Sequence, residues 1–283
     1  MIGLKRDTVG FIVASRIPNL FIIAITQVIT AYFLLGASPS QLLTPDFAFF
    51  LLTTAMIGAG GYIINDYFDQ KIDMVNRPET VVVGTDLRRR LALFSHSALT
   101  LAGIAIGFLI DPMVGAVHIF SSGALFTYSA GLKRLPLIGT LTIAFLTSLC
   151  LLIVLVYFRS FNLIVLAYAM FGCVTVFIRE SLKDIISAKG EKVFGVQSVP
   201  IVWGIRGAKL SIYLAGIIGV MMLGFYLLSL PNPTVRYFFM GVGVIIVWLF
   251  YRLYVADRIN DFEQIKRIID GLILLGLISM LLV

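Results

Sequence analysis

Residues 65–73 read Asn-Asp-Tyr-Phe-Asp-Gln-Lys-Ile-Asp and follow directly on a long apolar segment. Asn65, Asp69 and Asp73 are four residues apart, and Asp66 adds a third carboxylate. If the helix of the apolar segment continues through them, these side chains stack on one helical face. Carboxylates this close repel one another and are costly near a bilayer. The stretch therefore predicts a bound cation, and a divalent ion with oxygen ligands is the most natural candidate.

The composition places this stretch in a membrane protein. Of the 283 residues, 59% are hydrophobic and only 13% are charged, whereas a soluble domain carries about 25% charged residues. A water-soluble protein is excluded, and we expect one membrane-embedded domain over residues 1–283. The net charge of +7 follows from the topology described below, so a nucleic-acid partner has no support.

Hydropathy predicts an all-α protein with nine transmembrane helices. Each needs about 20 mostly apolar residues. Pro18 begins the first helix, and Asp111-Pro112 and residues 231–233 form tight turns. The nine segments lie near residues 17–36, 47–65, 91–110, 112–131, 137–158, 161–179, 208–230, 236–256 and 264–283.

The basic residues predict the orientation of these helices. If the N-terminus is cytoplasmic, all of the 22 Lys and Arg residues except Arg159 and Arg236 fall on the inner side. Of the acidic residues, only Asp46 and Asp111 lie outside. The acidic stretches then lie on the cytoplasmic side, where we expect the function. The protein is predicted to be a multi-pass protein of the prokaryotic inner membrane.

A second acidic stretch follows the sixth predicted helix. Glu180, Asp184, Ser187 and Glu191 are spaced 4, 3 and 4 residues apart, which is one helical face provided that Gly190 does not end the helix. These groups could share a metal with the first stretch, or they could simply solvate a helix end. Neither stretch has His or Cys nearby, so magnesium is favoured over zinc or copper. Interleaved Lys and Arg residues suit a diphosphate.

With these residues in hand, the chain resembles the UbiA superfamily of intramembrane prenyltransferases. The first family motif, Asn-Asp-x-x-Asp-x-x-x-Asp, is matched fully by residues 65–73. Further matches cover roughly residues 10–210, and the helix count extends the resemblance to the end of the chain. They are Arg16-x-Pro18-Asn19, Asn76-Arg77-Pro78-Glu79, Tyr128-Ser129, Lys133-Arg134-x-Pro136-x-x-Gly139, and Lys183-Asp184 with Gly190 and Phe194-Gly195.

The resemblance implies a nine-helix bundle around a central cavity and a Mg²⁺-dependent prenyl transfer. A polyprenyl diphosphate would be the donor, and a hydrophobic acceptor would supply either a quinone-precursor ring or a glycerol-phosphate lipid hydroxyl. The basic inner loops lean toward an anionic acceptor. The implied metal ligands are Asn65, Asp66, Asp69, Asp73, Asp184 and Glu191. The implied catalytic residues are Asp66, Asp69, Asp73 and Asp184. The implied substrate-binding residues are Arg16, Asn19, Arg77, Tyr128, Lys133 and Lys183.

Several positions depart from the family pattern. The second motif usually reads Asp-x-x-Asp-x-x-x-Asp, whereas this chain has Ser187 and Glu191 after Asp184. Thr140 stands where Asn is common, and Thr80-Val81 replaces an Arg-Pro pair. One or two metals therefore remain possible, as does a member with impaired catalysis that binds prenyl diphosphate. A small transporter is less favoured because the acids lie at helix ends and not in mid-span.

Overall fold

The computed structural model describes residues 2–76, 78–229 and 233–282. These residues are almost entirely helical and form no strand beyond an isolated bridge between Val83 and Leu87, so the all-α prediction is confirmed. The chain folds into two compact units. The first unit comprises residues 1–32, 36–132 and 153–161. The second unit comprises residues 33–35, 133–152 and 162–283.

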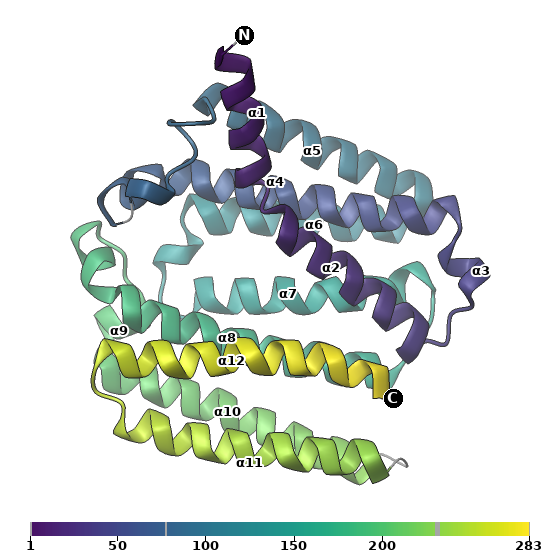
Figure 1. Ribbon diagram of the computed structural model, residues 1–283, viewed down its shortest axis with the longest axis vertical. Coiled ribbons are helices and arrows are strands. Elements are labelled where there is room, and N and C mark those ends of the chain that lie inside the picture. Colours follow the sequence, from purple (N-terminus) through teal and green to yellow (C-terminus); the bar gives the residue numbers. More distant parts are fainter. Residues whose placement is uncertain (1, 77, 230–232, 283) are drawn as a thin grey trace. The chain divides into compact units, whose positions relative to one another are not determined.

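The first unit is organised around the long helix α4, which packs against α1, α2, α5 and α6 (Figure 1). Phe47 and Phe50 of α4 are fully buried and pack against Tyr157 at the end of α7. The helices of this unit are α1 (Ile2–Ala14), α2 (Ile17–Ile29), the first part of the π-helical turn η1 (Thr30–Leu34), α3 (Pro39–Leu42), α4 (Pro45–Asn76), η2 (Pro78–Thr80), α5 (Arg89–Ile110), α6 (Pro112–Ala130) and the last turn of α7 (Ile138–Tyr157).

The second unit is built on α8, which packs against α10 and α12, while α11 packs against α10 and α12 (Figure 1). Its core is a cluster of buried aliphatic side chains that includes Leu182, Ile212, Leu253 and Ile269. The elements of this unit are η3 (Leu132–Arg134), most of α7, α8 (Leu163–Val193), α9 (Val199–Val202), α10 (Gly204–Ser229), α11 (Pro233–Val255), α12 (Ile259–Ser279) and η4 (Met280–Leu282).

Each of the nine segments predicted to span the membrane contains a helix. Within the described residues, six helices are long and apolar enough to cross a bilayer, which supports a multi-pass membrane protein. The other three predicted spans, α6, α11 and α12, do not meet this test, so nine crossings remain a prediction. The six spans are Ile17–Leu34, Pro45–Val75, Arg89–Ile110, Ile138–Tyr157, Leu163–Val193 and Gly204–Phe225.

The chain reversal at Asp111-Pro112 shows how the sequence sets helix ends. Asp111 accepts a hydrogen bond from the Met113 N–H at 2.7 Å and caps α6, whose first residue is Pro112. Arg159 Nη2 lies 2.6 Å from the same carboxylate. The Arg159 guanidinium and the Met113 N–H hold the pKa of Asp111 below its usual value. The charge pattern assigned both Asp111 and Arg159 to the outer side, and their pairing agrees with a shared side. The turn at residues 231–233 falls largely outside the described residues.

The N-terminal helix α1 is attached to the turn that follows the first acidic stretch. Asp7 accepts a hydrogen bond from the backbone N–H of Arg88 at 3.1 Å and pairs with the Arg88 guanidinium at 2.7 Å. Arg6 pairs with Asp86 at 2.8 Å. Gly10 lies so close to the turn that an added Cβ would sit 2.7 Å from the carbonyl carbon of Asp86. Because the opposing atoms are backbone, this contact requires glycine.

We expect Gly10→Ala to separate α1 from this turn. Overpacking costs about 1–3 kcal/mol, which corresponds to an about 5- to 160-fold larger population of the open form. Trypsin cleavage after Arg88, Arg89 or Arg90 should accelerate accordingly. The control is Gly123→Ala in α6, where an added Cβ has no neighbour within 4 Å. Equal cleavage rates in the two variants would contradict the attachment.

Candidate active site

The first acidic stretch lies on the last turns of α4, which continues beyond the apolar segment to Asn76. The predicted helical spacing of Asn65, Asp69 and Asp73 is therefore confirmed. Together with Asp66, these side chains are half-buried. The charges of Asp69 and Asp73 act on the Asp66 carboxylate. Three carboxylates thus share one electrostatic environment on a single helix.

Apolar packing fixes this end of α4. Ile63 and Ile64 are fully buried, and Ile63 belongs to a cluster that includes residues of α1 and of the turn at 82–87. Phe68 packs against Phe126 of α6 with 5.8 Å between the ring centroids. The guanidinium of Arg89 lies 4.6 Å from the centre of the Tyr67 ring. The polar residues of the stretch are therefore carried on a well-packed helix.

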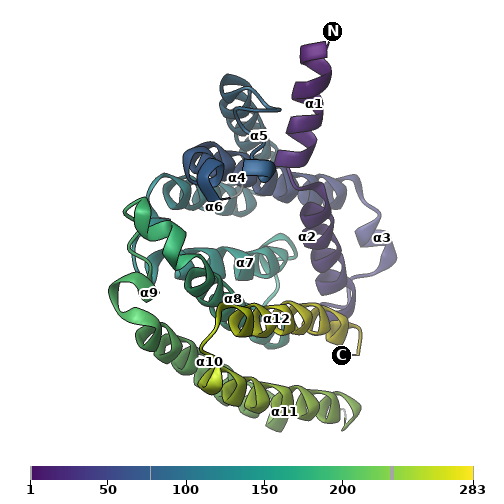
Figure 2. The same ribbon diagram turned by 60° about the vertical axis from the view of Figure 1, so that its left-hand side comes forward.

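Arg16 is a predicted site residue that contacts the first stretch directly. Its Nη2 donates to Asp66 Oδ1 at 2.7 Å, and its guanidinium lies 4.9 Å from the centre of the Tyr62 ring. Arg16 also occupies the bend between α1 and α2, with φ 50° and ψ 50°. Figure 2 shows the change of direction between these two helices. The side-chain nitrogen of Asn19, in the first turn of α2, lies 3.5 Å from the Tyr62 hydroxyl. Both residues of this predicted pair therefore lie beside the motif helix.

Two further predicted residues belong to this part of the chain. Tyr128 is half-buried in the last turn of α6, two residues after Phe126, which contacts the motif helix. Arg77 lies outside the described residues, so its predicted contact with a diphosphate stays a prediction.

The second acidic stretch lies on α8, which continues to Val193, so Gly190 does not end the helix. Thr140 of α7 donates a hydrogen bond to Asp184 Oδ2 at 3.1 Å. Ser187 Oγ lies 2.5 Å from Glu191 Oε1, and Ser198 donates to Glu191 Oε2 at 3.2 Å. The side chains of Asp184 and Glu191 are half-buried. Hydroxyl groups thus orient both carboxylates of this motif.

A network of ion pairs lies next to Asp184 in α8 and extends to α12. Glu180 is buried and pairs with Arg179 at 2.5 Å and with Lys183 at 3.1 Å. Arg179 also pairs with Asp270 of α12 at 2.6 Å, and Asp270 pairs in turn with Lys266 at 3.0 Å. Glu180 therefore anchors Lys183, a predicted diphosphate ligand. The other predicted lysine of this unit, Lys133, lies in η3.

Comparison with known proteins decides the family. The model of the UbiA prenyltransferase family matches residues 24–275. The chain belongs to the UbiA prenyltransferase family. This UbiA member is 31% identical over 194 residues to the digeranylgeranylglyceryl phosphate synthase of Methanobrevibacter smithii. The matched residues make up 66% of this chain and 67% of that relative. The chain is 32% identical over 203 residues to the synthase of Methanothrix thermoacetophila, covering 71% and 74%.

The chain spans about two thirds of the length of the curated relatives that it matches, and 62% of the synthase of Methanosarcina mazei. Solved structures agree in fold. A digeranylgeranylglyceryl phosphate synthase in membranes has a TM-score of 0.81 at 19% identity over 100% of both chains. A UbiA homologue from Archaeoglobus fulgidus bound to GPP and Mg²⁺ has a TM-score of 0.69 at 14% identity, covering 97% and 100%. The predicted class, a membrane prenyltransferase, is confirmed at the level of the family.

The departures from the UbiA pattern have structural partners in this chain. Thr140 and Ser187, which the sequence suggested as losses, each hydrogen-bond a remaining carboxylate of the second motif. Sequence reasoning missed the contacts of Ser198 and Asp270, since neither residue belongs to a motif or to the same helical face. Lys266 and Asp270 do have a helical spacing of four, which was the one available signal.

The side chains of both motifs fit magnesium by their chemistry, since amide and carboxylate oxygens are its preferred protein ligands. Among the residues that the structure describes, no three His, Cys, Asp or Glu side chains already form a metal-binding group. In the first motif, Asp66 is instead engaged by Arg16. Ligand oxygens are therefore available on each helix, and binding requires side-chain rearrangement.

We expect Ser187→Asp to tighten magnesium binding about three- to tenfold, because it adds a carboxylate next to Glu191. Calorimetric titration of the purified protein with Mg²⁺ measures this effect. Ala188→Asp adds the same charge one residue further along α8 and serves as the control. If Ser187→Asp has no effect, or only the effect of the control, Ser187 does not face the metal.

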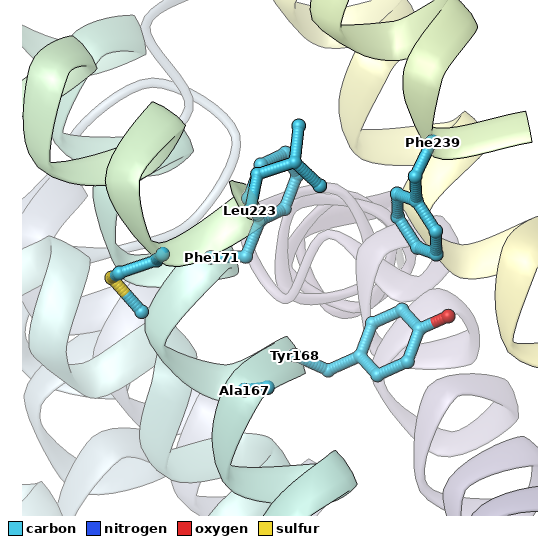
Figure 3. Close-up of a pocket in the computed structure, with 6 residues that line it drawn as sticks. Ala167, Tyr168, Phe171, Leu223 and Phe239 are labelled. Carbon is cyan, nitrogen blue, oxygen red and sulfur yellow. The ribbon is translucent and has the colours of Figure 1, made fainter. Parts of the chain in front are cut away.

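Two apolar cavities lie within the second unit of this UbiA chain. Figure 3 shows the rings of Tyr168 and Phe239 facing one of them, together with Leu223. The other lies among α8, α10, α11 and α12. Phe171 lines both cavities. Neither includes a residue of the acidic motifs, so these spaces suit hydrocarbon and not the reacting diphosphate.

Proposed function

We propose that this UbiA member transfers a polyprenyl group from a prenyl diphosphate to the hydroxyl of a glycerol-phosphate lipid, with magnesium as the cofactor. The observation that carries this proposal is the intact first motif on α4, with its carboxylates grouped and a guanidinium already bound to one of them. The names of the curated relatives favour a glycerol-phosphate acceptor over an aromatic ring.

In the proposed reaction, the bond between prenyl C1 and the diphosphate oxygen breaks, and diphosphate leaves with the bonding electrons. The acceptor oxygen then bonds to C1, and its proton is released. Magnesium, when bound, neutralises charge on the leaving group. Asn65, Asp66, Asp69 and Asp73 would supply metal ligands from the first motif, and Asp184 and Glu191 would hold a second ion or bridge through water.

The cationic side chains would act on the same leaving group. Lys133, Lys183 and Arg77 would bind phosphoryl oxygens, which lowers the barrier because charge accumulates there as the bond breaks. Glu180 supports this role for Lys183 by holding its ammonium beside Asp184. Tyr128 would present its ring to the allylic cation, and Asn19 would lie toward the acceptor.

We also propose the topology in which this chemistry takes place. Nine helices would cross the prokaryotic inner membrane around a central cavity as one domain, with the N-terminus and both motifs on the cytoplasmic side. The near-exclusive inner location of Lys and Arg supports this topology. The isoprenoid tail would lie among apolar helices, and exclusion of water would protect the cation from hydrolysis.

The test is a transfer assay with purified protein in lipid nanodiscs. Labelled prenyl diphosphates of several lengths are incubated with Mg²⁺ and either a glycerol-phosphate lipid or an aromatic quinone precursor. The proposal expects a prenylated lipid that disappears when Mg²⁺ is chelated. If only the aromatic quinone precursor is prenylated, the proposed acceptor, a glycerol-phosphate lipid, is wrong. Donor binding without any product would instead indicate a member with impaired catalysis.

A further inference from the structure

The guanidinium of Arg16 is held by three features of the first unit. Its backbone is in the left-handed region, which is uncommon for a residue other than glycine. The face of Tyr62 lies 4.9 Å from it, and Asp66 Oδ1 lies 2.7 Å from Nη2. The bend between α1 and α2 therefore delivers a positive charge to a carboxylate of the first motif.

This charge stands where the proposed metal would need to approach. The side chain of Asp66 is only 17% exposed, and the charges of Asp69 and Asp73 act on it. A partly buried carboxylate among like charges is stabilised by a cation. A divalent ion at the same carboxylate would lie within a few ångströms of the guanidinium and be repelled by it. Arg16 and magnesium are thus alternative partners of Asp66.

The Arg16 side chain has the means to move. It is 43% exposed, and as the N-cap of α2 it makes no side-chain capping hydrogen bond. Tyr62 offers a neighbouring ring face on which a guanidinium remains stabilised after it leaves the carboxylate. An arginine freed in this position carries a planar set of donors suited to phosphoryl oxygens.

We propose that Arg16 is a displaceable partner of Asp66. It neutralises this carboxylate until magnesium diphosphate arrives, then releases Asp66 to the metal and binds the diphosphate. This inference rests on the proposed function for the identity of the anion. It gives Arg16 two opposite effects: it competes with free metal, and it assists the metal-diphosphate complex.

Arg16→Gln tests both effects on the full chain without turnover. Mn²⁺ titrated alone and followed by electron paramagnetic resonance should bind about three- to tenfold more tightly than to the wild type. Inorganic pyrophosphate titrated at saturating Mg²⁺ should bind roughly tenfold more weakly. Arg89→Gln is the matched control, because it removes the same charge from the ring of Tyr67, one residue from Asp66. It should change either affinity less than about twofold.

Arg16→Gly provides a second variant, because glycine adopts the left-handed backbone of this position without strain. It should reproduce both shifts. The proposal is overturned if metal affinity is unchanged or weaker in both variants, or if both ligands shift in the same direction, as expected for a fixed structural bridge. Because neither titration requires an acceptor, failure here is distinguishable from failure of the transfer assay.

Discussion

Asp69→Asn is expected to reduce Mg²⁺-dependent release of diphosphate from a prenyl donor by about 10²- to 10³-fold. Asp69 lies one turn beyond Asn65 and one turn before Asp73 on α4. The amide keeps the volume of the side chain but removes its negative charge, so the magnesium that neutralises the leaving group is held less tightly. Release of labelled diphosphate from the prenyl donor measures the loss.

The matched control is Asp46→Asn, which makes the same chemical change in the first turn of the same helix. Its activity should stay within about twofold of the wild type, because Asp46 lies at the opposite end of α4. Both variants should unfold at similar temperatures. Activity retained in Asp69→Asn would mean that the first motif does not hold the metal.

Asp184→Asn is expected to cost roughly 10²-fold in the same assay. Asp184 is the first carboxylate of the second motif, and the charges of Glu191, Lys183 and Glu180 act on it. Thr140→Val removes the hydroxyl that orients Asp184 but leaves the carboxylate, so a smaller loss of about tenfold is expected.

The control is Asp257→Asn. Asp257 lies in the loop between α11 and α12, and its side chain is 93% exposed. Full activity in Asp184→Asn would mean that the acidic residues of the second motif only solvate the end of a helix. Equal losses in Asp184→Asn and Thr140→Val would show that orientation of the carboxylate, and not its charge, limits the reaction.

Local periodicity predicted much of this site. The spacing of the first motif required a helix through residue 73, and α4 provides it. The spacing from Glu180 to Glu191 required α8 to pass Gly190, and it does. The helices α4 and α8 continue past the ends of the predicted apolar segments at residues 65 and 179, because hydropathy reports where apolar residues stop and not where backbone hydrogen bonding stops.

Contacts between distant segments could not be read from the sequence. The pairs Arg16–Asp66 and Arg179–Asp270 join residues 50 and 91 positions apart. Their partners are fixed by packing of α2 on α4 and of α12 on α8, which no local pattern encodes. Charged residues also explain why α12 does not qualify as a span by composition: Asp261, Glu263, Lys266, Arg267 and Asp270 lie within it.

Because α4 is unbroken, the ligands of the first motif are spread along the helix axis and do not surround a single point. A helix rises 1.5 Å per residue, so Asn65 and Asp73 are about 12 Å apart along the axis. Magnesium binds oxygens at about 2.1 Å, so one ion reaches only neighbouring ligands of the motif. Asn65 and Asp73, at the two ends of the motif, must then contact different parts of the bound complex. Replacing each of them should perturb a different phosphoryl group.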